Sequence, residues 1–322
     1  MSHANKLIII SGPTASGKTK TSIDLAEKIM NQLKIPTAIV NFDSLLFYKE
    51  LSIGTAKPTL DEQKGIPHFM IDIESICSPM NASDFIKICE NKITELLNKN
   101  ICVILVGGSA FYLRALLKGM YESTSPSKEI KNKYDQILKD KGIDAIVDYL
   151  QLHDPESLKN LHLNDHYRLS RAAIHFEMTG TKISEQKQNL DDLFPYDFNE
   201  IVHPWKFIHF YLDLPKDEHF KIITSRTEKM FADGLMSEIQ KLQDDGFSLD
   251  EKPLSSIGYK EAIELRNGQF PSEEACIERI SISTRQLAKS QRTFFKRIIP
   301  KYDCNPLKDQ DKIFSLVELF LR

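Results

Sequence analysis

The segment Gly12–Thr19 combines residue types and a spacing that suit anion chemistry. It reads Gly-Pro-Thr-Ala-Ser-Gly-Lys-Thr, follows an apolar run at 7–10 and opens an amphipathic segment. A strand, a glycine-rich loop and a helix in this order are the context of a P-loop. The glycines let successive backbone N–H groups turn toward an anion, Lys18 can reach an outer phosphate, and the Thr19 hydroxyl can ligate Mg²⁺. We therefore predict a polyphosphate-binding loop made of Gly12, Pro13, Thr14, Ala15, Ser16, Gly17, Lys18 and Thr19.

Two further strand ends carry groups that can act beside this loop. Asp43 follows a predicted strand at 37–42, and two glycines and Ser109 follow one at 101–106. Ligands bind beyond the carboxyl ends of parallel strands, so we expect Asp43 to be a metal-linked carboxylate or a general base in preference to a helix cap. Ser109 can hydrogen-bond a phosphate, whereas an ATPase would place an acidic residue near such a strand end. Arg114, in the next helix, is either a phosphate ligand or a solvated residue.

Basic residues gather near the C-terminus without acidic neighbours. No Asp or Glu occurs between Arg279 and Lys301. Four cations at offsets of 0, 4, 7 and 11 share one helical face there, namely Arg285, Lys289, Arg292 and Lys296. Gln286, Gln291, Phe294 and Phe295 are interleaved with them. In a chain with a net charge of −3, this pattern favours a surface for nucleic-acid phosphates over a merely solvated helix face.

The elements that must position these groups alternate between strand and helix. Strand runs at 7–11, 37–42 and 101–106, with a weaker one at 69–73, are separated by helical segments. This alternation predicts an α/β fold, a P-loop NTPase-like parallel sheet with helices on both faces. Residues 121–195 read as helices only, so we predict an all-helical insertion domain there, between core segments 1–120 and 196–322. The second core segment begins with a strand at 208–214 and continues with helices at 217–245 and 272–298.

Cysteine usage and hydropathy indicate the cellular compartment in which we expect the protein. Five cysteines are scattered singly, without a C-x-x-C pair, which is typical of reduced thiols in a cytoplasmic protein. We see no signal peptide and no apolar run of membrane-spanning length. We therefore expect a cytoplasmic enzyme with no membrane partner and no obligate protein partner.

Taken together, the motifs resemble those of the tRNA dimethylallyltransferases, or tRNA isopentenyltransferases. The resemblance extends over residues 6–300 in the same order. The most specific segments are Ile-Gly-Thr-Ala-Lys-Pro at 53–58 and Thr-Arg-Gln-Leu-Ala-Lys at 284–289. Membership would imply that the P-loop binds dimethylallyl diphosphate with Mg²⁺, and that the prenyl group passes to N6 of the adenosine 3′ of the anticodon in tRNA. The target base would have to leave the anticodon-loop stack to be reached.

The resemblance also implies roles for individual residues. Asp43 would accept the proton of the amine, while Lys18, Thr19 and Ser109 with Mg²⁺ on Thr19 would stabilise the leaving diphosphate. Arg114 and Lys216 would add positive charge to the diphosphate site. The basic C-terminal helix and the insertion would hold the tRNA anticodon stem-loop. The residues expected to contact tRNA are Asp43, Ser44, Leu45, Leu46, Tyr167, Arg168, Arg171, Lys260, Arg285, Gln286, Lys289, Arg292 and Lys296.

The chain departs from the family pattern at several of these positions. Leu46 replaces a usual glutamine, Tyr167 another, and Ser109 and Lys216 replace a threonine and an arginine while keeping the hydroxyl and the charge. Diphosphate binding should therefore persist, while base recognition by Leu46 and Tyr167 should differ. Three alternatives are a free-nucleotide isopentenyltransferase, a P-loop nucleotide kinase and an RNA-binding protein with a decayed P-loop. The insertion and the basic stripe favour a tRNA acceptor over a free nucleotide. A kinase would need an arginine-rich lid over the phosphates, for which we see no clear segment, and the intact Lys18, Thr19 and Asp43 argue against a decayed P-loop.

Overall fold

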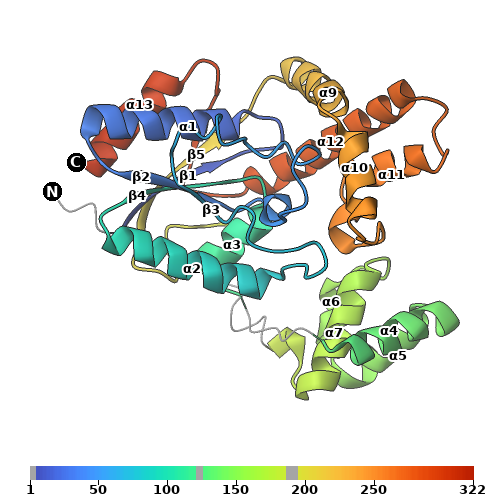
Figure 1. Ribbon diagram of the computed structural model, residues 1–322. Coiled ribbons are helices and arrows are strands. Elements are labelled where there is room, and N and C mark those ends of the chain that lie inside the picture. The colour runs from blue at the N-terminus through green and yellow to red at the C-terminus, as the bar shows by residue number, and fades with distance from the viewer. Residues whose placement is uncertain (1–4, 121–125, 186–194) are drawn as a thin grey trace. The chain divides into compact units, whose positions relative to one another are not determined.

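The computed structural model describes residues 5–120, 126–185 and 195–322 (Figure 1). These residues form two compact units, one made of Met1–Lys118 with Tyr196–Arg322 and the other of Gly119–Pro195. The first unit contains the sheet, and the second is helical.

The first unit is built on a six-stranded parallel sheet with the order β3-β2-β4-β1-β5-β6. Its central strands are runs of apolar residues buried on both faces, as a doubly covered parallel sheet requires; Leu7, Ile8, Ile9 and Ile10 of β1 are all fully buried. The strands are β1 (Lys6–Ser11), β2 (Thr37–Asn41), β3 (His68–Phe69), β4 (Cys102–Gly107), β5 (Lys206–Leu212) and β6 (Tyr302–Cys304).

Helices cover both faces of this sheet, as the sequence predicted. On one face α1 (Lys18–Lys28) and α13 (Gln310–Leu321) pack against it, where Ile23 and Ile313 share a core with Ile8 and Ile10. On the other face lie α2 (Ala82–Asn98) and α3 (Ala110–Lys118) (Figure 1). The P-loop, Asp43 and Ser109 lie in loops that follow the carboxyl ends of β1, β2 and β4.

A second apolar core lies under the C-terminal helices of the first unit. These are α9 (Lys216–Ala232), α10 (Leu235–Asp244), α11 (Tyr259–Arg266) and α12 (Glu273–Phe295). The core includes Phe231, Leu235, Tyr259 and Ile280. The single helix predicted at 217–245 is wrong, because Gly234 adopts a φ of 102° and divides it into α9 and α10. Short 3₁₀ turns occur at Ser44–Phe47 and Lys252–Ser255, and a π-turn at Ile29–Leu33 extends α1.

The predicted strand at 69–73 ends after Phe69. Met70 and Asp72 have φ values of 61° and 55°, a left-handed conformation that a strand cannot contain. The short edge strand β6 and helices α11 and α13 were not predicted from the sequence.

The second unit consists of α4 (Lys128–Lys141), α5 (Asp144–His153), α6 (Pro155–Asn160) and α7 (His166–Thr179). Its core contains Tyr134, Leu150 and Leu169. Asp154 is buried and caps α6, where its carboxylate accepts hydrogen bonds from Ser157 and Ser184. This helical unit can thus bury an apolar core of its own.

Candidate active site

A tight loop joins β1 to α1 at the predicted P-loop. A Cβ atom on Gly12 would lie 2.3 Å from the carbonyl oxygen of Leu212 on β5, so a side chain at this position would collide with backbone. Gly17 caps α1 with a φ of 81°, a left-handed conformation that favours glycine. The unsatisfied N–H groups at the start of α1 open onto this loop, and the helix dipole favours an anion there. We call residues 12–19 the P-loop cradle.

Three charged side chains from different elements interact beside the P-loop cradle. Lys18 begins α1, Asp43 follows β2, and Arg226 lies on α9. Burial lowers the pKa of Lys18 from 10.5 to about 8; the Asp43 carboxylate opposes this shift and the Arg226 guanidinium adds to it. Burial also lowers the pKa of Arg226, again against the attraction of Asp43. Lys18 and Arg226 are partly desolvated cations that share one carboxylate. A bound anion would therefore stabilise their charged forms.

Asp43 is fixed by the residue two positions before it. The Asp43 N–H donates to Asn41 Oδ1 at 2.9 Å, and Asn41 Nδ2 donates to the carbonyls of Asp43 and Met70 at 2.9 and 3.0 Å. The Asp43 carboxylate accepts from the Leu45 N–H at 3.4 Å and so also caps the 3₁₀ turn. The two interpretations weighed for Asp43, a chemical role and a cap, are therefore compatible.

Gly108 directly follows β4, which ends at Gly107, and lies beside Lys18. A Cβ on Gly108 would be 3.5 Å from Lys18 Nζ and 3.3 Å from the carbonyl oxygen of Gly12. Lys18 Nζ itself donates to the carbonyl of Pro13 at 2.7 Å. Ser109 Oγ accepts from the Tyr112 N–H at 3.4 Å at the start of α3. The absence of a side chain at Gly108 thus lets this loop approach the P-loop cradle closely.

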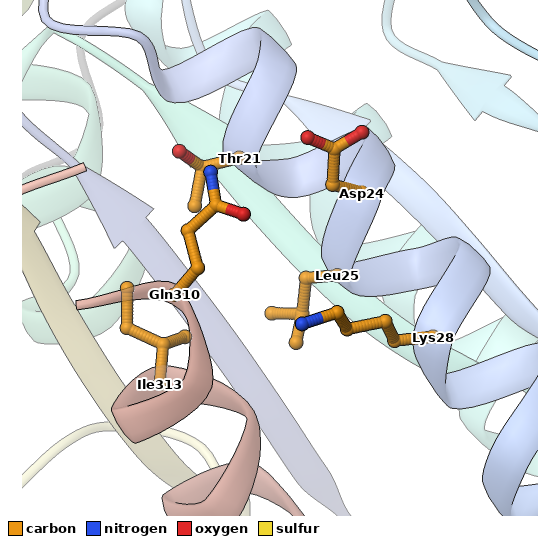
Figure 2. Close-up of a pocket in the computed structure, with 6 residues that line it drawn as sticks. All are labelled: Thr21, Asp24, Leu25, Lys28, Gln310 and Ile313. Carbon is orange, nitrogen blue, oxygen red and sulfur yellow. The ribbon is translucent and has the colours of Figure 1, made fainter. Parts of the chain in front are cut away.

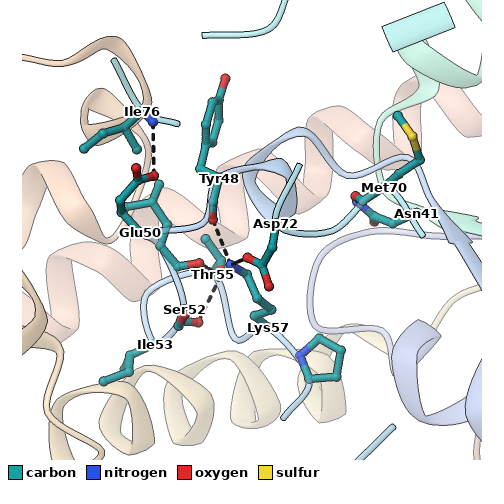
Figure 3. A network of polar contacts seen from close by, with 12 residues as sticks. Asn41, Tyr48, Glu50, Ser52, Ile53, Thr55, Lys57, Met70, Asp72 and Ile76 are labelled. Atoms are coloured by element: carbon teal, nitrogen blue, oxygen red, sulfur yellow. Dashed lines mark hydrogen bonds and ion pairs between the residues drawn. The ribbon is translucent and has the colours of Figure 1, made fainter. Parts of the chain in front are cut away.

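The Ile-Gly-Thr-Ala-Lys-Pro segment forms a loop whose Thr55 and Lys57 belong to a network of polar contacts (Figure 3). The Glu238 carboxylate accepts from the N–H groups of Ile53 and Gly54 at 2.8 and 3.3 Å. Lys57 is buried and pairs with Asp72, and its Nζ donates to the Tyr48 carbonyl at 2.8 Å. The carbonyl of Thr55 in turn accepts from Arg226 Nη2 at 3.1 Å. This loop therefore helps to position Arg226.

Two hydroxyl groups of the P-loop cradle suit a phosphate and its cation. Ser16 Oγ is buried and has no hydrogen-bond partner among the described residues. Thr19 is exposed in the first turn of α1. In the parts of the chain that the structure describes, no group of three or more His, Cys, Asp or Glu side chains is arranged to hold a metal ion. Thr19 Oγ1 is the hydroxyl of the cradle that could hold a divalent cation.

The other two cations predicted to bind diphosphate, Arg114 and Lys216, lie on α3 and α9. Arg114 is half-buried on α3. Lys216 is exposed at the start of α9, with Nζ 5.5 Å from the ring centre of Phe220. A diphosphate role for these two residues remains a prediction.

The basic stripe predicted on the C-terminal helix divides into two pairs. Lys289 on α12 and Lys296, the C-cap residue that follows this helix, are exposed. Arg285 is half-buried, with its guanidinium 5.1 Å from the ring centre of Phe220. Arg292 is also half-buried, and its Nη2 lies 2.8 Å from the Asp213 carboxylate. The two lysines, together with the exposed Gln286, are thus presented to solvent more fully than the two arginines.

The remaining predicted tRNA contacts lie in three places. Ser44, Leu45 and Leu46 are half-buried in the 3₁₀ turn next to Asp43, and Lys260 is exposed on α11 with Nζ 3.8 Å from Glu264. In the second unit, α7 carries Tyr167, which is 67% exposed, Arg168, which pairs with Asp165 at 2.9 Å, and the half-buried Arg171. Their role in tRNA binding remains a prediction.

Sequence reasoning missed Arg226. The signal was available, because Ile223 and Thr227 are buried positions of α9 and Arg226 interrupts the stripe that they define. A charged residue within an apolar stripe needs a partner in the interior. Here that requirement is met by Asp43 and the Thr55 carbonyl.

A small pocket between α1 and α13 is lined by none of the predicted residues (Figure 2). Its walls are Thr21, Asp24, Leu25, Lys28, Gln310 and Ile313.

Among the helices described, none is both long enough and apolar enough to cross a membrane.

Comparison with known proteins gives one consistent family. The model of the family described as IPP transferase matches residues 46–298. The chain is 33% identical to tRNA dimethylallyltransferase 1 of Trichlorobacter lovleyi, and the alignment covers 90% of each protein. It is 35% identical to tRNA dimethylallyltransferase of Prochlorococcus marinus, over 92% of this chain and 91% of that protein. A tRNA isopentenylpyrophosphate transferase from Bacillus halodurans superposes with a TM-score of 0.68 at 27% identity, over 98% of this chain and 97% of that one. A eukaryotic dimethylallyltransferase acting on tRNA gives 0.78 at 26% identity, over 98% of this chain and 78% of that one.

Proposed function

The chain belongs to the IPP transferase family, and on this basis we propose that it is a tRNA dimethylallyltransferase whose P-loop cradle holds the diphosphate of the prenyl donor. The enzyme moves a dimethylallyl group from dimethylallyl diphosphate to N6 of the adenosine 3′ of the anticodon. Diphosphate leaves, and the tRNA carries N6-isopentenyladenosine. The observation that carries the assignment of the site is the electrostatic coupling of Lys18 in the cradle to Asp43 and Arg226.

The donor diphosphate is proposed to lie in the P-loop cradle. Lys18 and Arg226 are both partly desolvated, so a diphosphate would restore the electrostatic stabilisation that burial removes from them. Ser16 Oγ, buried and without a protein partner among the described residues, can donate to a phosphate oxygen. Mg²⁺ on Thr19 would neutralise charge that develops on the leaving group. Arg114 and Lys216 are assigned a supporting electrostatic role.

Asp43 is proposed to act as the general base. N6 of the adenosine attacks the C1 carbon of the donor, the bond between C1 and the diphosphate oxygen breaks, and one N6 proton passes to the Asp43 carboxylate. The amine is a weak nucleophile because its lone pair is delocalised into the purine ring, so removal of this proton assists the attack. Lys18, Thr19 and Ser109 stabilise the departing diphosphate. The clamp formed by Asn41 fixes the backbone of Asp43 for this task.

The tRNA is proposed to contact polar and basic side chains of each unit. The contacts in the first unit are Gln286 and Lys289 on α12, Lys296 at its C-cap and Lys260 on α11. On α7 of the helical unit they are Tyr167, Arg168 and Arg171. These side chains can bind the phosphate backbone and stack on bases. Ser44, Leu45 and Leu46 stand beside Asp43 and would border the flipped adenine.

Label transfer from radioactive dimethylallyl diphosphate tests the function. Purified protein and Mg²⁺ are incubated with either an unmodified tRNA that has adenosine 3′ of its anticodon or AMP. We expect label in tRNA, recovered on digestion as N6-isopentenyladenosine, and none in AMP. Label in AMP would show a free-nucleotide isopentenyltransferase, and ATP turnover without prenyl transfer would show a kinase.

A further inference from the structure

Two consecutive residues of α12 are directed at the P-loop cradle. Gln291 contacts the cradle itself, and Arg292 reaches it through His219 of α9. Resting on the proposed function, we propose that Asp213, Arg292 and His219 form a relay that fixes the Thr14–Ala15 peptide of the cradle for donor binding, so that Arg292 is a positioning residue of the diphosphate site and not a tRNA contact. We call these three residues the His219 relay.

The His219 relay has one arrangement of protons. His219 Nε2 lies 2.8 Å from the carbonyl oxygen of Thr14, which can only accept, so Nε2 carries the hydrogen. His219 Nδ1 lies 2.6 Å from Arg292 Nη2, which can only donate, so Nδ1 offers its lone pair. The imidazole is therefore neutral, and burial lowers its pKa; Arg292 and Lys18 act in the same direction, whereas Asp213 and the bond to Thr14 oppose it.

Arg292 is itself held in place by a carboxylate. Its Nε lies 2.9 and 3.0 Å from the two carboxylate oxygens of Asp213, and its Nη2 lies 2.8 Å from one of them. A planar guanidinium that is held at two nitrogens has little freedom to turn. Since His219 is fully buried, each member of the relay is oriented by the next. The order runs from Asp213 through Arg292 and His219 to Thr14.

The hydrogen bond to Thr14 sets the direction of a cradle N–H group. The carbonyl of Thr14 and the N–H of Ala15 belong to one planar trans peptide, so they point in opposite directions. When His219 holds the carbonyl, the Ala15 N–H must face away from His219. Ala15 has a φ of 60°, a left-handed conformation that has an energetic cost for a residue with a side chain. Without the relay, this peptide could rotate to relieve that cost.

Gln291 holds the other side of Thr14. The Thr14 N–H donates to Gln291 Oε1 at 2.8 Å, and Gln291 Nε2 donates to the Gly108 carbonyl at 2.9 Å. Both backbone groups of Thr14 are thus bonded to protein side chains. Gln291 also joins the P-loop cradle to Gly108, the residue after β4, which strengthens the inference that this part of α12 serves the donor site.

Pyrophosphate binding in the absence of tRNA tests the relay. The probe is inorganic pyrophosphate with Mg²⁺, measured by isothermal titration calorimetry on the full chain. We expect His219→Phe and Arg292→Met to weaken binding at least tenfold, which is about 1.4 kcal/mol. His219→Gln should stay within about threefold of the wild type, because its amide can both donate to Thr14 and accept from Arg292. Lys289→Met, on the exposed part of the same helix, is the matched control and should leave pyrophosphate affinity unchanged.

A second measurement separates positioning from contact with RNA. We expect Arg292→Met to leave the salt dependence of tRNA binding unchanged, whereas Lys289→Met should reduce the slope by about one. A reduced slope in Arg292→Met with normal pyrophosphate affinity would overturn the proposal and return Arg292 to the RNA surface. If His219→Phe does not fold, Asp213→Asn keeps the packing and should weaken pyrophosphate binding in the same direction; wild-type affinity in both Asp213→Asn and Arg292→Met would also overturn it. A wild-type protein that binds no pyrophosphate would instead refute the donor site itself.

Discussion

Deprotonation of Lys18 should limit donor capture at alkaline pH. Burial lowers the pKa of Lys18 from 10.5 to about 8, a difference equivalent to about 3.4 kcal/mol between its two protonation states. Its ammonium is therefore about 90% present at pH 7 and about 10% present at pH 9. Because kcat/KM reports the pKa values of free enzyme, we expect kcat/KM for dimethylallyl diphosphate to fall about tenfold between these pH values.

The assay is an initial-rate measurement at low donor and saturating tRNA from pH 6.5 to pH 9.5. Lys18→Arg is the matched variant, because arginine stays protonated throughout this range. Its rate should be lower because the guanidinium is larger, but its profile should lack the fall centred near pH 8. Once donor is bound, its negative charge stabilises the ammonium, so kcat should fall less than kcat/KM. A wild-type profile that stays flat to pH 9.5, or the same fall in Lys18→Arg, would refute the role given to Lys18.

Three further outcomes follow from the site and the core. Asp43→Asn should lower single-turnover prenyl transfer by about 10²–10⁴-fold while tRNA affinity, measured by filter binding, stays within about twofold; an undiminished rate would remove Asp43 as the base. Replacing both Lys289 and Lys296 with alanine should reduce the slope of log K against log salt for tRNA by about two, and an unchanged slope would contradict the RNA surface on α12. His209 is buried, and its pKa in the folded protein is lowered from 6.5 to about 3. Below pH 6.5 His209 therefore gains a proton in the unfolded state but not in the folded state. The free energy of unfolding should decrease as the pH falls. Between pH 6.5 and pH 4 this residue alone should lower the free energy of unfolding by about 3 kcal/mol. In urea unfolding His209→Gln should lose less stability over that interval, and an equal loss would contradict this explanation.

The sequence predicted the sheet and the P-loop because both are encoded locally. The apolar run of β1, the glycines at 12 and 17 and the Lys-Thr pair are contiguous, and each requirement can be recognised without knowledge of the rest of the chain. Asp43 could be placed because the carboxyl ends of parallel strands meet at one edge of the sheet.

The contacts that complete the site join residues distant in sequence. His219 meets Thr14 across 205 positions, and Gln291 meets it across 277. No periodicity within α9 or α12 indicates which loop each side chain will reach. The helical spacing correctly placed Arg292 among the cations of α12, but spacing does not report that Asp213 and His219 lie opposite it.

Edge elements were missed for a different reason. The strand β6 has only three residues, and two of them, Tyr302 and Asp303, are exposed. A segment this short carries no detectable alternation, and it becomes a strand only because β5 offers a free edge for pairing.

The central claim is that the P-loop cradle holds the donor by its diphosphate, with the prenyl carbon directed at Asp43. A crystal structure with a thio-substituted analogue of dimethylallyl diphosphate that cannot transfer its prenyl group would test this most directly. We predict the analogue's phosphates within hydrogen-bonding distance of the backbone N–H groups of the cradle, Lys18 and Arg226, and its C1 carbon on the side of Asp43. An empty cradle with the analogue bound elsewhere would contradict the account.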